Sequence, residues 1–217
     1  MDLLTFYSDS HKSMYENYFL ESYDKHLKNS FILKSKEITQ LSKTGDYDST
    51  GFNETMLEKI KFILENFDSS DEPFVFADCD IQFFGDFKES LLSELGDHDI
   101  AFQDDIVCRC AGFFIAKRNK QVKKFMELVL ETTPKFDHDQ TAMNHLLNNQ
   151  HKFNLNIKEK KLPTNQYFTV AASTNARQWN GQDFTIPKGV LVHHSNWTVG
   201  LENKINLLEL VREKLKL

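Results

Sequence analysis

The sequence lacks a long apolar run, a basic amino-terminal segment and an excess of positive charge. No stretch approaches the ~20 apolar residues that a membrane-spanning helix requires. The first ten residues have neither the basic start nor the apolar core of a signal peptide. A net charge of −6 argues against nucleic acid as a general partner, because phosphate binding needs a basic surface. We therefore expect a soluble, cytoplasmic protein without a membrane span.

Cysteine is also scarce. The chain contains Cys79, Cys108 and Cys110, an odd number that does not suggest a disulfide framework. Cys108-x-Cys110 has neither the two-residue gap nor the second cysteine pair of a typical zinc site. We predict that all three are reduced and structural, as in an intracellular protein.

No internal repeat, low-complexity tract or linker divides the chain. Its 217 residues, 40% of them hydrophobic, are enough for one substantial core. We therefore expect a single domain over residues 1–217.

Apolar periodicity alternates between strand and helix patterns along the first half of the chain. This alternation predicts an α/β domain with a mainly parallel central sheet flanked by helices. Ser13 and Glu16 have the spacing of a capping box at the start of the first helix. The predicted strands cover 3–8, 30–34, 74–84, 99–103 and 111–116, the predicted helices cover 13–27, 54–67, 86–95, 119–132, 139–150 and 200–216, and residues 43–50 form a loop.

Asp78 and Asp80 stand out because they lie inside the apolar run 74–84. Buried carboxylates are costly unless a cation or hydrogen bonds meet them. On an extended chain residues 78 and 80 project the same way, while Cys79 points to the other face. Two hard oxygen ligands at the carboxyl end of a strand suit Mg²⁺ or Mn²⁺, with substrate phosphates as further ligands. The pattern predicts a metal–diphosphate site.

Asp-x-Asp alone is weak evidence, because the tripeptide is common in solvated turns and helix caps. The chain has two more, Asp97-His98-Asp99 and Asp137-His138-Asp139. The strand before Asp78 distinguishes the first tripeptide, since ligands of open α/β sheets bind at the carboxyl ends of strands.

A second polar cluster lies near the carboxyl terminus. Imidazole is a competent Mn²⁺ ligand, so His193 or His194 could complete a site that the carboxylates begin. Gly200 would let backbone approach a phosphate closely, and Lys204 could neutralise it. The alternative is that the histidines divide between core and surface and that Lys204 is a solvated helix residue.

Together these segments resemble a known family. Four motifs occur in family order: Asp78-Cys-Asp80, then Cys110-Ala-Gly112-Phe-Phe, then Asp139-Gln140-Thr-Ala-Met-Asn144, then His194-Ser-Asn196-Trp-Thr-Val-Gly200 with Lys204. They resemble the signatures of the nucleotide-diphospho-sugar transferases, glycosyltransferases of the Rossmann-like GT-A fold. The resemblance spans about residues 55–210. It extends to compact virus-encoded glycosyltransferase domains, which would act in the host cytoplasm.

The resemblance implies a role for each motif. Asp78, Asp80 and His194 would hold Mn²⁺ or Mg²⁺. A lysine on the preceding helix would approach the donor; Lys59 and Lys61 lie ~200° apart around a helix, and we favour Lys59. The nucleoside would contact Thr5, Phe6, Tyr7, Ser8, Asp9 and Ser10. Further donor contacts are assigned to Cys79, Gly112, Asn196, Gly200 and Lys204, of which Gly200 and Lys204 would take the diphosphate.

The implied function is metal-dependent transfer of a sugar, with retention of configuration, from a UDP-sugar to a glycan, glycoprotein or other hydroxyl acceptor. Asp139 and Gln140 match positions that recognise donor-sugar hydroxyls, with Asp104, Asp105 and Arg109 as further candidates. The candidate catalytic residues are therefore Asp139, Gln140, Lys204 and Asp105. Two alternatives remain open: a metal-dependent phosphohydrolase, and a lapsed transferase that binds nucleotide without turnover.

Overall fold

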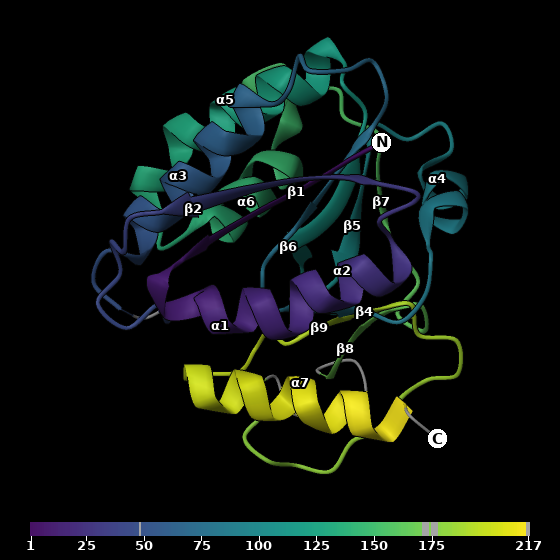
Figure 1. Ribbon diagram of the computed structural model, residues 1–217. Coiled ribbons are helices and arrows are strands. Elements are labelled where there is room, and N and C mark those ends of the chain that lie inside the picture. The colour runs from purple at the N-terminus through teal and green to yellow at the C-terminus, as the bar shows by residue number, and fades with distance from the viewer. Residues whose placement is uncertain (48, 171–173, 175–177, 216–217) are drawn as a thin grey trace.

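The structure is a computed structural model that describes residues 1–47, 49–170, 174 and 178–215. Its centre is a six-stranded sheet in the order β2-β1-β3-β6-β5-β7 (Figure 1). The strands are β1 (Asp2–Ser8), β2 (Ile32–Ile38), β3 (Phe74–Ala77), β5 (Ile100–Asp104), β6 (Arg109–Ala116) and β7 (Glu159–Lys161).

Strand β6 runs against its neighbours β3 and β5, whereas β1 is parallel to β2 and β3, and β5 is parallel to β7. The prediction of a mainly parallel α/β sheet is therefore confirmed, with β6 as an antiparallel insertion. Because β1, β3 and β5 share one direction, their carboxyl ends meet at one edge, where the antiparallel β6 begins. Ser8, Asp78, Asp105 and Cys110 are thereby brought to the same end of the sheet.

Helices cover both faces of this sheet. On one face lie α3 (Phe52–Glu65), α5 (Lys120–Thr132) and α6 (Asp139–Asn148), and on the other lie α1 (Lys12–Met14), α2 (Glu21–His26) and α4 (Lys88–Leu95) (Figure 1). Strand β3 shows why both faces are buried: Phe74 and Phe76 join the first core cluster, while Val75 and Ala77 join the second. Short 3-10 segments cover Asp9–His11, Thr133–Lys135 and Gln150–Phe153.

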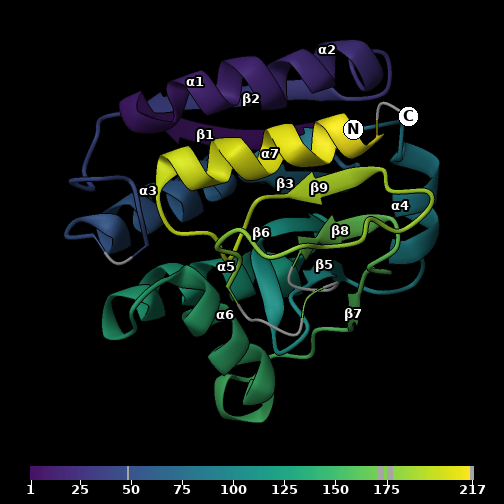
Figure 2. The same cartoon turned by 90° about the horizontal axis from the view of Figure 1, so that it is seen from below.

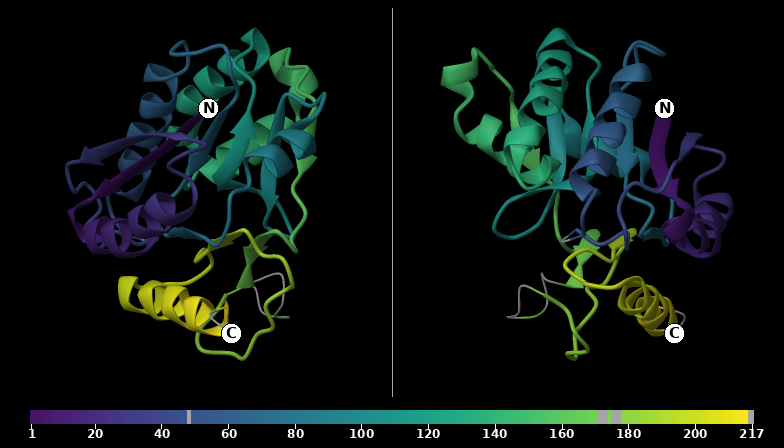
Figure 3. Two further views of the ribbon diagram at one scale, coloured as in Figure 1. Left: turned by 45° about the vertical axis from the view of Figure 1, so that its right-hand side comes forward. Right: turned by 90° about the vertical axis from the view of Figure 1, so that its left-hand side faces the viewer.

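A smaller sheet lies below the carboxyl ends of the central strands (Figure 3). It consists of β4 (Ile81–Phe83), β9 (Val192–His194) and β8 (Tyr167–Thr169), in that order. Helix α7 (Leu201–Leu215) lies beside α1 and α2 (Figure 2), and its Leu208 packs on Met14 and Tyr18. This small sheet and α7 close the lower side of the central sheet's functional edge.

Two local predictions, the single strand over 74–84 and the Ser13 cap, were wrong, and the helix predicted over 13–27 is observed with an irregular middle. The run 74–84 is two strands, β3 and β4, that belong to different sheets and are separated by a turn at Cys79 and Asp80. The helix expected over 13–27 is interrupted by a π-helical segment, Tyr15–Leu20. Ser13 is not its cap, because the 3-10 turn Asp9–His11 leads directly into α1 and the Ser13 hydroxyl accepts from Asn17 instead.

The other predicted elements are observed with shifted ends. The second strand starts at Ile32 and continues to Ile38 rather than covering 30–34. The last position of the helix expected over 200–216 lies outside the described residues. Among the helices that the structure describes, none is long and apolar enough to cross a bilayer.

Candidate active site

A cavity of about 510 Å³ opens at the carboxyl edge of the central sheet. Its lining comes from the ends of β1, β3 and β5, the start of β6, the first turn of α6, the loop before α3 and the segment 194–204. Segments more than a hundred residues apart in the sequence therefore share one cavity.

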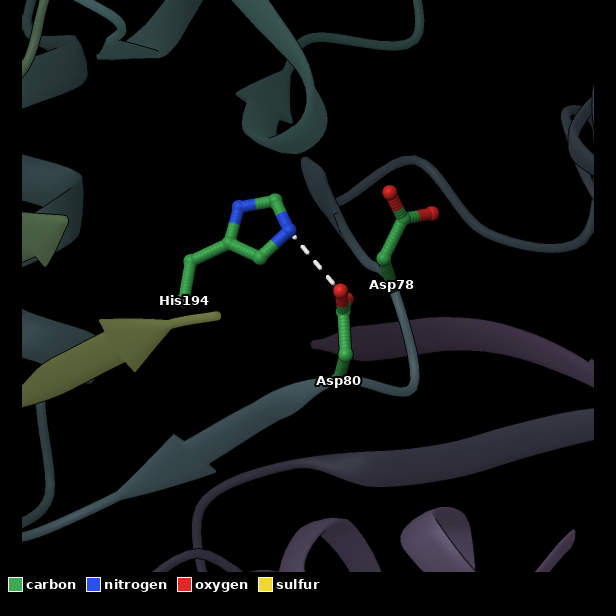
Figure 4. Close-up of side chains that lie close together, drawn as sticks. All are labelled: Asp78, Asp80 and His194. Atoms are coloured by element: carbon green, nitrogen blue, oxygen red, sulfur yellow. Dashed lines mark ion pairs between the residues drawn. The ribbon is translucent and has the colours of Figure 1, made fainter. Parts of the chain in front are cut away.

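Asp78, Asp80 and His194 lie at the floor of this cavity (Figure 4). Asp78 directly follows β3, and its backbone N–H donates to Gly112 O at 2.7 Å. In the β4–β9 ladder His194 is the partner of Ile81, which places it beside Asp80. Each of the three offers a ligand atom, and these atoms lie within 4.8 Å of one another. The three side chains predicted as metal ligands thus converge, although no ion is part of the structure.

Hydrogen bonds fix the orientation of the His194 ring. Gln103 is fully buried, and its Nε2 donates to the carbonyls of Tyr167 and Phe168, so its Oε1 must be the atom that faces His194. His194 Nδ1–H therefore donates to Gln103 Oε1 at 2.8 Å. The other nitrogen, Nε2, lies 3.2 Å from Asp80 Oδ1 and is a lone-pair acceptor in this tautomer. Two acceptors that face each other across this distance suit a cation between them.

Asp80 is almost fully buried, at 4% exposure. Lys204 Nζ lies 2.6 Å from its Oδ2, and His194 approaches its Oδ1. Burial raises the pKa of Asp80, but the Lys204 ammonium outweighs burial and holds the pKa well below its usual value. The carboxylate is consequently ionised and available as a ligand over the whole physiological range.

Lys59 lies on the cavity side of α3. Its Nζ is 2.9 Å from Asp139 Oδ2, 3.4 Å from Asp78 Oδ1 and 4.7 Å from the centre of the Phe76 ring. Burial lowers the pKa of this ammonium, yet Asp139 and Asp78 raise it above its ordinary value, so Lys59 stays charged. Lys61 is on the exposed side of the helix and pairs with Glu58. Lys59 rather than Lys61 thus lies on the cavity side of α3, as the helical geometry predicted. The contact of Lys59 with the donor stays a prediction.

Asp105 is held by neutral donors rather than by a cation. Asn196 Nδ2 donates to its Oδ1 at 2.5 Å, Gln140 Nε2 donates to its Oδ2 at 3.1 Å, and the Trp197 side chain also donates to it. Burial raises the pKa of this carboxyl, and these donors oppose the shift. The Gln140 carbonyl accepts from the Ala111 N–H, so both ends of this amide are engaged. Gln140 thus braces Asp105 against β6.

Gly112 is required by the close packing at the cavity floor. A Cβ at this position would lie 2.5 Å from His194 Cε1 and closer still to Asp78 Oδ2. Neither neighbour could yield without moving a candidate metal ligand. Cys79 and Cys110 are buried around the same floor, and burial raises the pKa of both thiols well above the ordinary value, which favours the inert protonated form.

The predicted nucleoside segment is only partly in the cavity. Phe6, Tyr7 and Ser8 contribute to its lining. Thr5 is buried beneath, and its Oγ1 has no hydrogen-bond partner. Asp9 lies on the 3-10 turn Asp9–His11, outside the cavity lining.

Two other candidates point elsewhere. Asp104 pairs with Lys161, and Arg109 pairs with Glu159 and Asn148. Both therefore brace strand β7 and helix α6 rather than the cavity.

The sequence interpretation missed several residues of the cavity wall. His11 closes the nucleoside end: burial and the nearby Lys204 lower its pKa to about 4, so the ring is neutral. Another wall is formed by the loop residues Ser42, Gly45, Asp46 and Tyr47, and Asp46 accepts from the Gly200 N–H at 2.9 Å. A histidine after a strand and an aspartate in a polar loop carry no signal of their own, so a sequence alone could not single them out.

The charges on the wall are unbalanced. The described lining residues include five aspartates and two lysines, so that the carboxylates and ammonium groups together carry a net charge of −3. They are Asp46, Asp78, Asp80, Asp105, Asp139, Lys59 and Lys204. Such a cavity repels an anionic nucleotide unless a cation enters with it.

Comparison with known proteins connects this geometry to a family. A family model described as nucleotide-diphospho-sugar transferase matches residues 16–208. The chain belongs to this family. The predicted enzyme class, a nucleotide-sugar-dependent glycosyltransferase, is thereby confirmed at family level. Comparison of the sequence with curated proteins gives no match.

Solved structures confirm the GT-A fold of this transferase. A glycosyltransferase involved in glycosylation of the major capsid of PBCV-1 superposes with a TM-score of 0.63 at 11% identity, covering 96% of this chain and 98% of that chain. The galactosyltransferase LgtC, in complex with donor and acceptor sugar analogs, gives 0.59 at 12%, covering 96% and 95%. GlyE of Streptococcus pneumoniae TIGR4 gives 0.59 at 14%, where the match covers 94% of this chain but only 59% of GlyE. At these identities the likeness shows the fold alone.

Proposed function

We propose that this transferase uses a UDP-sugar as donor, Mn²⁺ or Mg²⁺ as cofactor, and a hydroxyl group of a glycan or glycoprotein as acceptor. The observation that carries the proposal is the convergence of Asp78, Asp80 and His194 on one point of the cavity floor. Two carboxylates and an imidazole are a ligand set that Mn²⁺ accepts readily. When bound, the metal would neutralise negative charge on the diphosphate.

The residues around the floor fit such a cation. Gln103 turns the lone pair of His194 Nε2 towards Asp80. In metal sites, a ligating histidine is commonly oriented in this way by a hydrogen bond to its other ring nitrogen. Gly112 leaves room where a side chain would displace Asp78 and His194. The net negative charge of the wall supplies the electrostatic demand for a cation.

The remaining groups suit a nucleoside diphosphate and its sugar. Lys204 Nζ projects from α7 to the floor, where it would stabilise the charge that builds on the leaving diphosphate. Gly200 begins the same helix, and its N–H would be a phosphate donor once Asp46 has moved away. Asp139 and Asp105, with Gln140 behind Asp105, are assigned to the hydroxyls of the transferred sugar.

We propose transfer with retention of configuration. The acceptor oxygen would form a bond to the anomeric carbon while the bond from that carbon to the diphosphate oxygen breaks. The departing diphosphate keeps the bonding electrons and takes the hydroxyl proton, so no protein nucleophile is required. The arrangement His194-x₅-Gly200-x₃-Lys204, which resembles a shorter version seen in retaining relatives, supports this choice.

The test is thermal stabilisation and UDP release with a panel of nucleotide-sugars in Mn²⁺. We expect a UDP-sugar to stabilise the protein and to be hydrolysed slowly to UDP. Asp80→Asn should keep the fold and lose metal-dependent stabilisation. Asp104→Asn is the matched control, because this carboxylate pairs with Lys161 away from the cavity. UDP binding by Asp80→Asn as tight as in the parent would show that the wrong carboxylates are assigned.

The same assay separates the two alternatives. A phosphohydrolase would release inorganic phosphate, and a lapsed module would bind UDP without turnover. Among the residues that the structure describes, a single group of metal-ligating side chains is found, whereas a two-metal phosphohydrolase needs ligands for a second ion. The cytoplasmic location and the virus-encoded origin stay predictions.

A further inference from the structure

A second depression of about 470 Å³ adjoins the cavity and shares three of its walls, Tyr47, Phe52 and His138. We name it the side groove; its lining consists of Tyr47, residues 49–54, Asp137 and His138. His138 immediately precedes Asp139, which lines the cavity and forms an ion pair with Lys59. The side groove is therefore a continuation of the cavity on the side of the transferred sugar rather than of the nucleoside.

The floor of the side groove is held in place by Asn53 at the start of α3. Its Nδ2 donates to the carbonyls of Thr133 at 3.3 Å and Phe136 at 3.1 Å. Its Oδ1 is buried and has no hydrogen-bond partner among the described residues. The side chain of Asn53 thus ties the start of α3 to the segment 133–136 and fixes the shape of the groove floor.

The loop on the opposite side is braced by its own hydrogen bonds. Ser49 Oγ lies 2.8 Å from Ser42 Oγ, and the Phe52 N–H donates to the Ser49 carbonyl at 3.1 Å. The Tyr47 side chain is 57% exposed and lines both the cavity and the side groove. An exposed aromatic ring above polar groups is suited to packing on the apolar face of a sugar ring.

The chemistry of the lining restricts the ligand. The described lining residues of the side groove include the carboxylates of Glu54 and Asp137 and the hydroxyls of Ser49 and Thr50, and contain no lysine or arginine. Carboxylate, amide and hydroxyl groups match the hydrogen-bonding groups of a carbohydrate. Two carboxylates without a basic partner disfavour an anionic ligand such as a uronic acid or a sulfated sugar.

We propose that the side groove is the acceptor site and that it binds a neutral glycan, with the Tyr47 ring packed on a sugar and Glu54 and Asp137 facing its hydroxyls. This inference rests on the proposed function, since it names the acceptor class of the same site. The glycan chain would extend from the reacting hydroxyl beside Asp139 past His138 to solvent.

The experiment measures two reactions in parallel. Donor hydrolysis without acceptor reports the cavity, and transfer to a panel of neutral mono- and disaccharides reports the side groove. Matched uronic-acid derivatives of the same sugars are the anionic arm. We expect transfer to at least one neutral sugar and transfer at least tenfold slower to its uronic-acid counterpart.

Variants then locate the acceptor. We expect Tyr47→Ala to raise the acceptor KM roughly tenfold, which corresponds to about 1.4 kcal/mol of binding, while Tyr47→Phe restores it. Asp137→Ala should raise the acceptor KM severalfold and leave donor hydrolysis and UDP affinity unchanged. Glu58→Ala is the control, because Glu58 lies one turn further along α3 and pairs with Lys61 outside the groove.

The outcomes distinguish this inference from the proposed function. If UDP-sugars are hydrolysed but no neutral sugar accepts, or if the acceptor KM is unchanged in both Tyr47→Ala and Asp137→Ala, the side-groove assignment is wrong and the transferase proposal stands. If no UDP-sugar is bound or hydrolysed, the proposed function fails and the side-groove assignment fails with it. Saturation-transfer NMR of the accepting sugar, with UDP and Mn²⁺ present, gives a binding readout independent of turnover.

Discussion

The two walls of the cavity are built in different ways. The sheet wall, formed by residues 77–80, 103–105 and 110–112, is fixed by strand ladders and by buried side chains such as Gln103. The loop wall, formed by residues 42–47 and 196–204, has a hydrogen bond from Gly200 to Asp46 between its two segments, and it is joined to the sheet wall by an ion pair from Lys204 to Asp80 and a hydrogen bond from Asn196 to Asp105. The sheet wall keeps its side chains in place without a ligand. In the loop wall, a bound phosphate could replace Asp46 as the partner of Gly200 and Asp80 as the partner of Lys204.

Gly112→Ala should have the largest effect, because it breaks the sheet wall. The added methyl would contact His194 and Asp78 at distances that real Cβ atoms do not show, so the candidate ligands must separate. We expect more than a hundredfold loss of donor hydrolysis and of Mn²⁺ affinity, measured by calorimetry. Gly85→Ala is the control, since its Cβ would meet only the flexible end of Leu191. Unchanged Mn²⁺ affinity in Gly112→Ala would contradict this view of the floor.

A pair of glutamines tests the sheet wall more finely. Gln103 accepts from His194 Nδ1, whereas Gln82 Nε2 donates to His193 Nδ1 at 3.1 Å, so the two neighbouring histidines are held in opposite tautomers. Gln103→Leu should reduce Mn²⁺ affinity about 10- to 100-fold, because loss of the hydrogen bond that orients a metal-ligating histidine typically weakens metal binding by about that factor.

Gln82→Leu is the matched control for Gln103→Leu. It should lower the melting temperature, since Gln82 also donates to the Leu208 carbonyl, and leave Mn²⁺ affinity intact. Equal losses of metal affinity in both variants would mean that Gln103 supports the fold rather than the ring orientation.

Lys204→Ala probes the loop wall, and its effects should have opposite signs. Without nucleotide, removal of the ammonium that neutralises Asp80 should tighten Mn²⁺ binding, because a competing cation is lost. With a donor, hydrolysis should slow about tenfold or more, since the charge that stabilises the leaving diphosphate is absent. If Lys204 were a solvated surface residue, neither quantity would change by much; titration calorimetry and UDP release at saturating metal decide this.

Asp46→Asn should give the smallest effect. Asp46 occupies the Gly200 N–H that we assign to a phosphate and adds a negative charge to the wall. We therefore expect UDP to bind a few-fold more tightly to the variant in Mn²⁺. Glu202→Gln removes the same charge at the same helix end without a described contact to Gly200, and should change UDP affinity less. Weaker UDP binding by Asp46→Asn would instead make Asp46 a residue that closes over the ligand.

The sequence predicted the sheet wall well and the loop wall poorly, for a physical reason. Buried strands carry apolar runs, so the position of Asp78 at a strand end and the sheet direction could be inferred from local pattern. His194 and Lys204 were candidates from the polar cluster near the carboxyl terminus, and the family motif then assigned their roles. Asp46, His11 and Gln103 have functional positions only because of contacts made across the fold, and Gln103 reads as an ordinary strand residue.

The turn after β3 is a second feature that could not be predicted from the local sequence. Residues 74–84 form one continuous apolar run, yet the chain changes sheets at Cys79 and Asp80. Nothing in the local sequence distinguishes this run from a single strand. The break depends on β9, which arrives more than a hundred residues later to pair with β4.

The buried pair of Lys59 and Asp139 has a consequence for how such domains diverge. Loss of either partner alone strands a charge in the interior, which typically costs about 3–5 kcal/mol, whereas replacement of both by apolar residues is often tolerated. Relatives that have lost sugar transfer but keep the fold should therefore carry substitutions at both Lys59 and Asp139 rather than at one of them. We therefore expect coordinated loss of this lysine and this aspartate to identify inactive relatives from sequence, whereas this chain retains both.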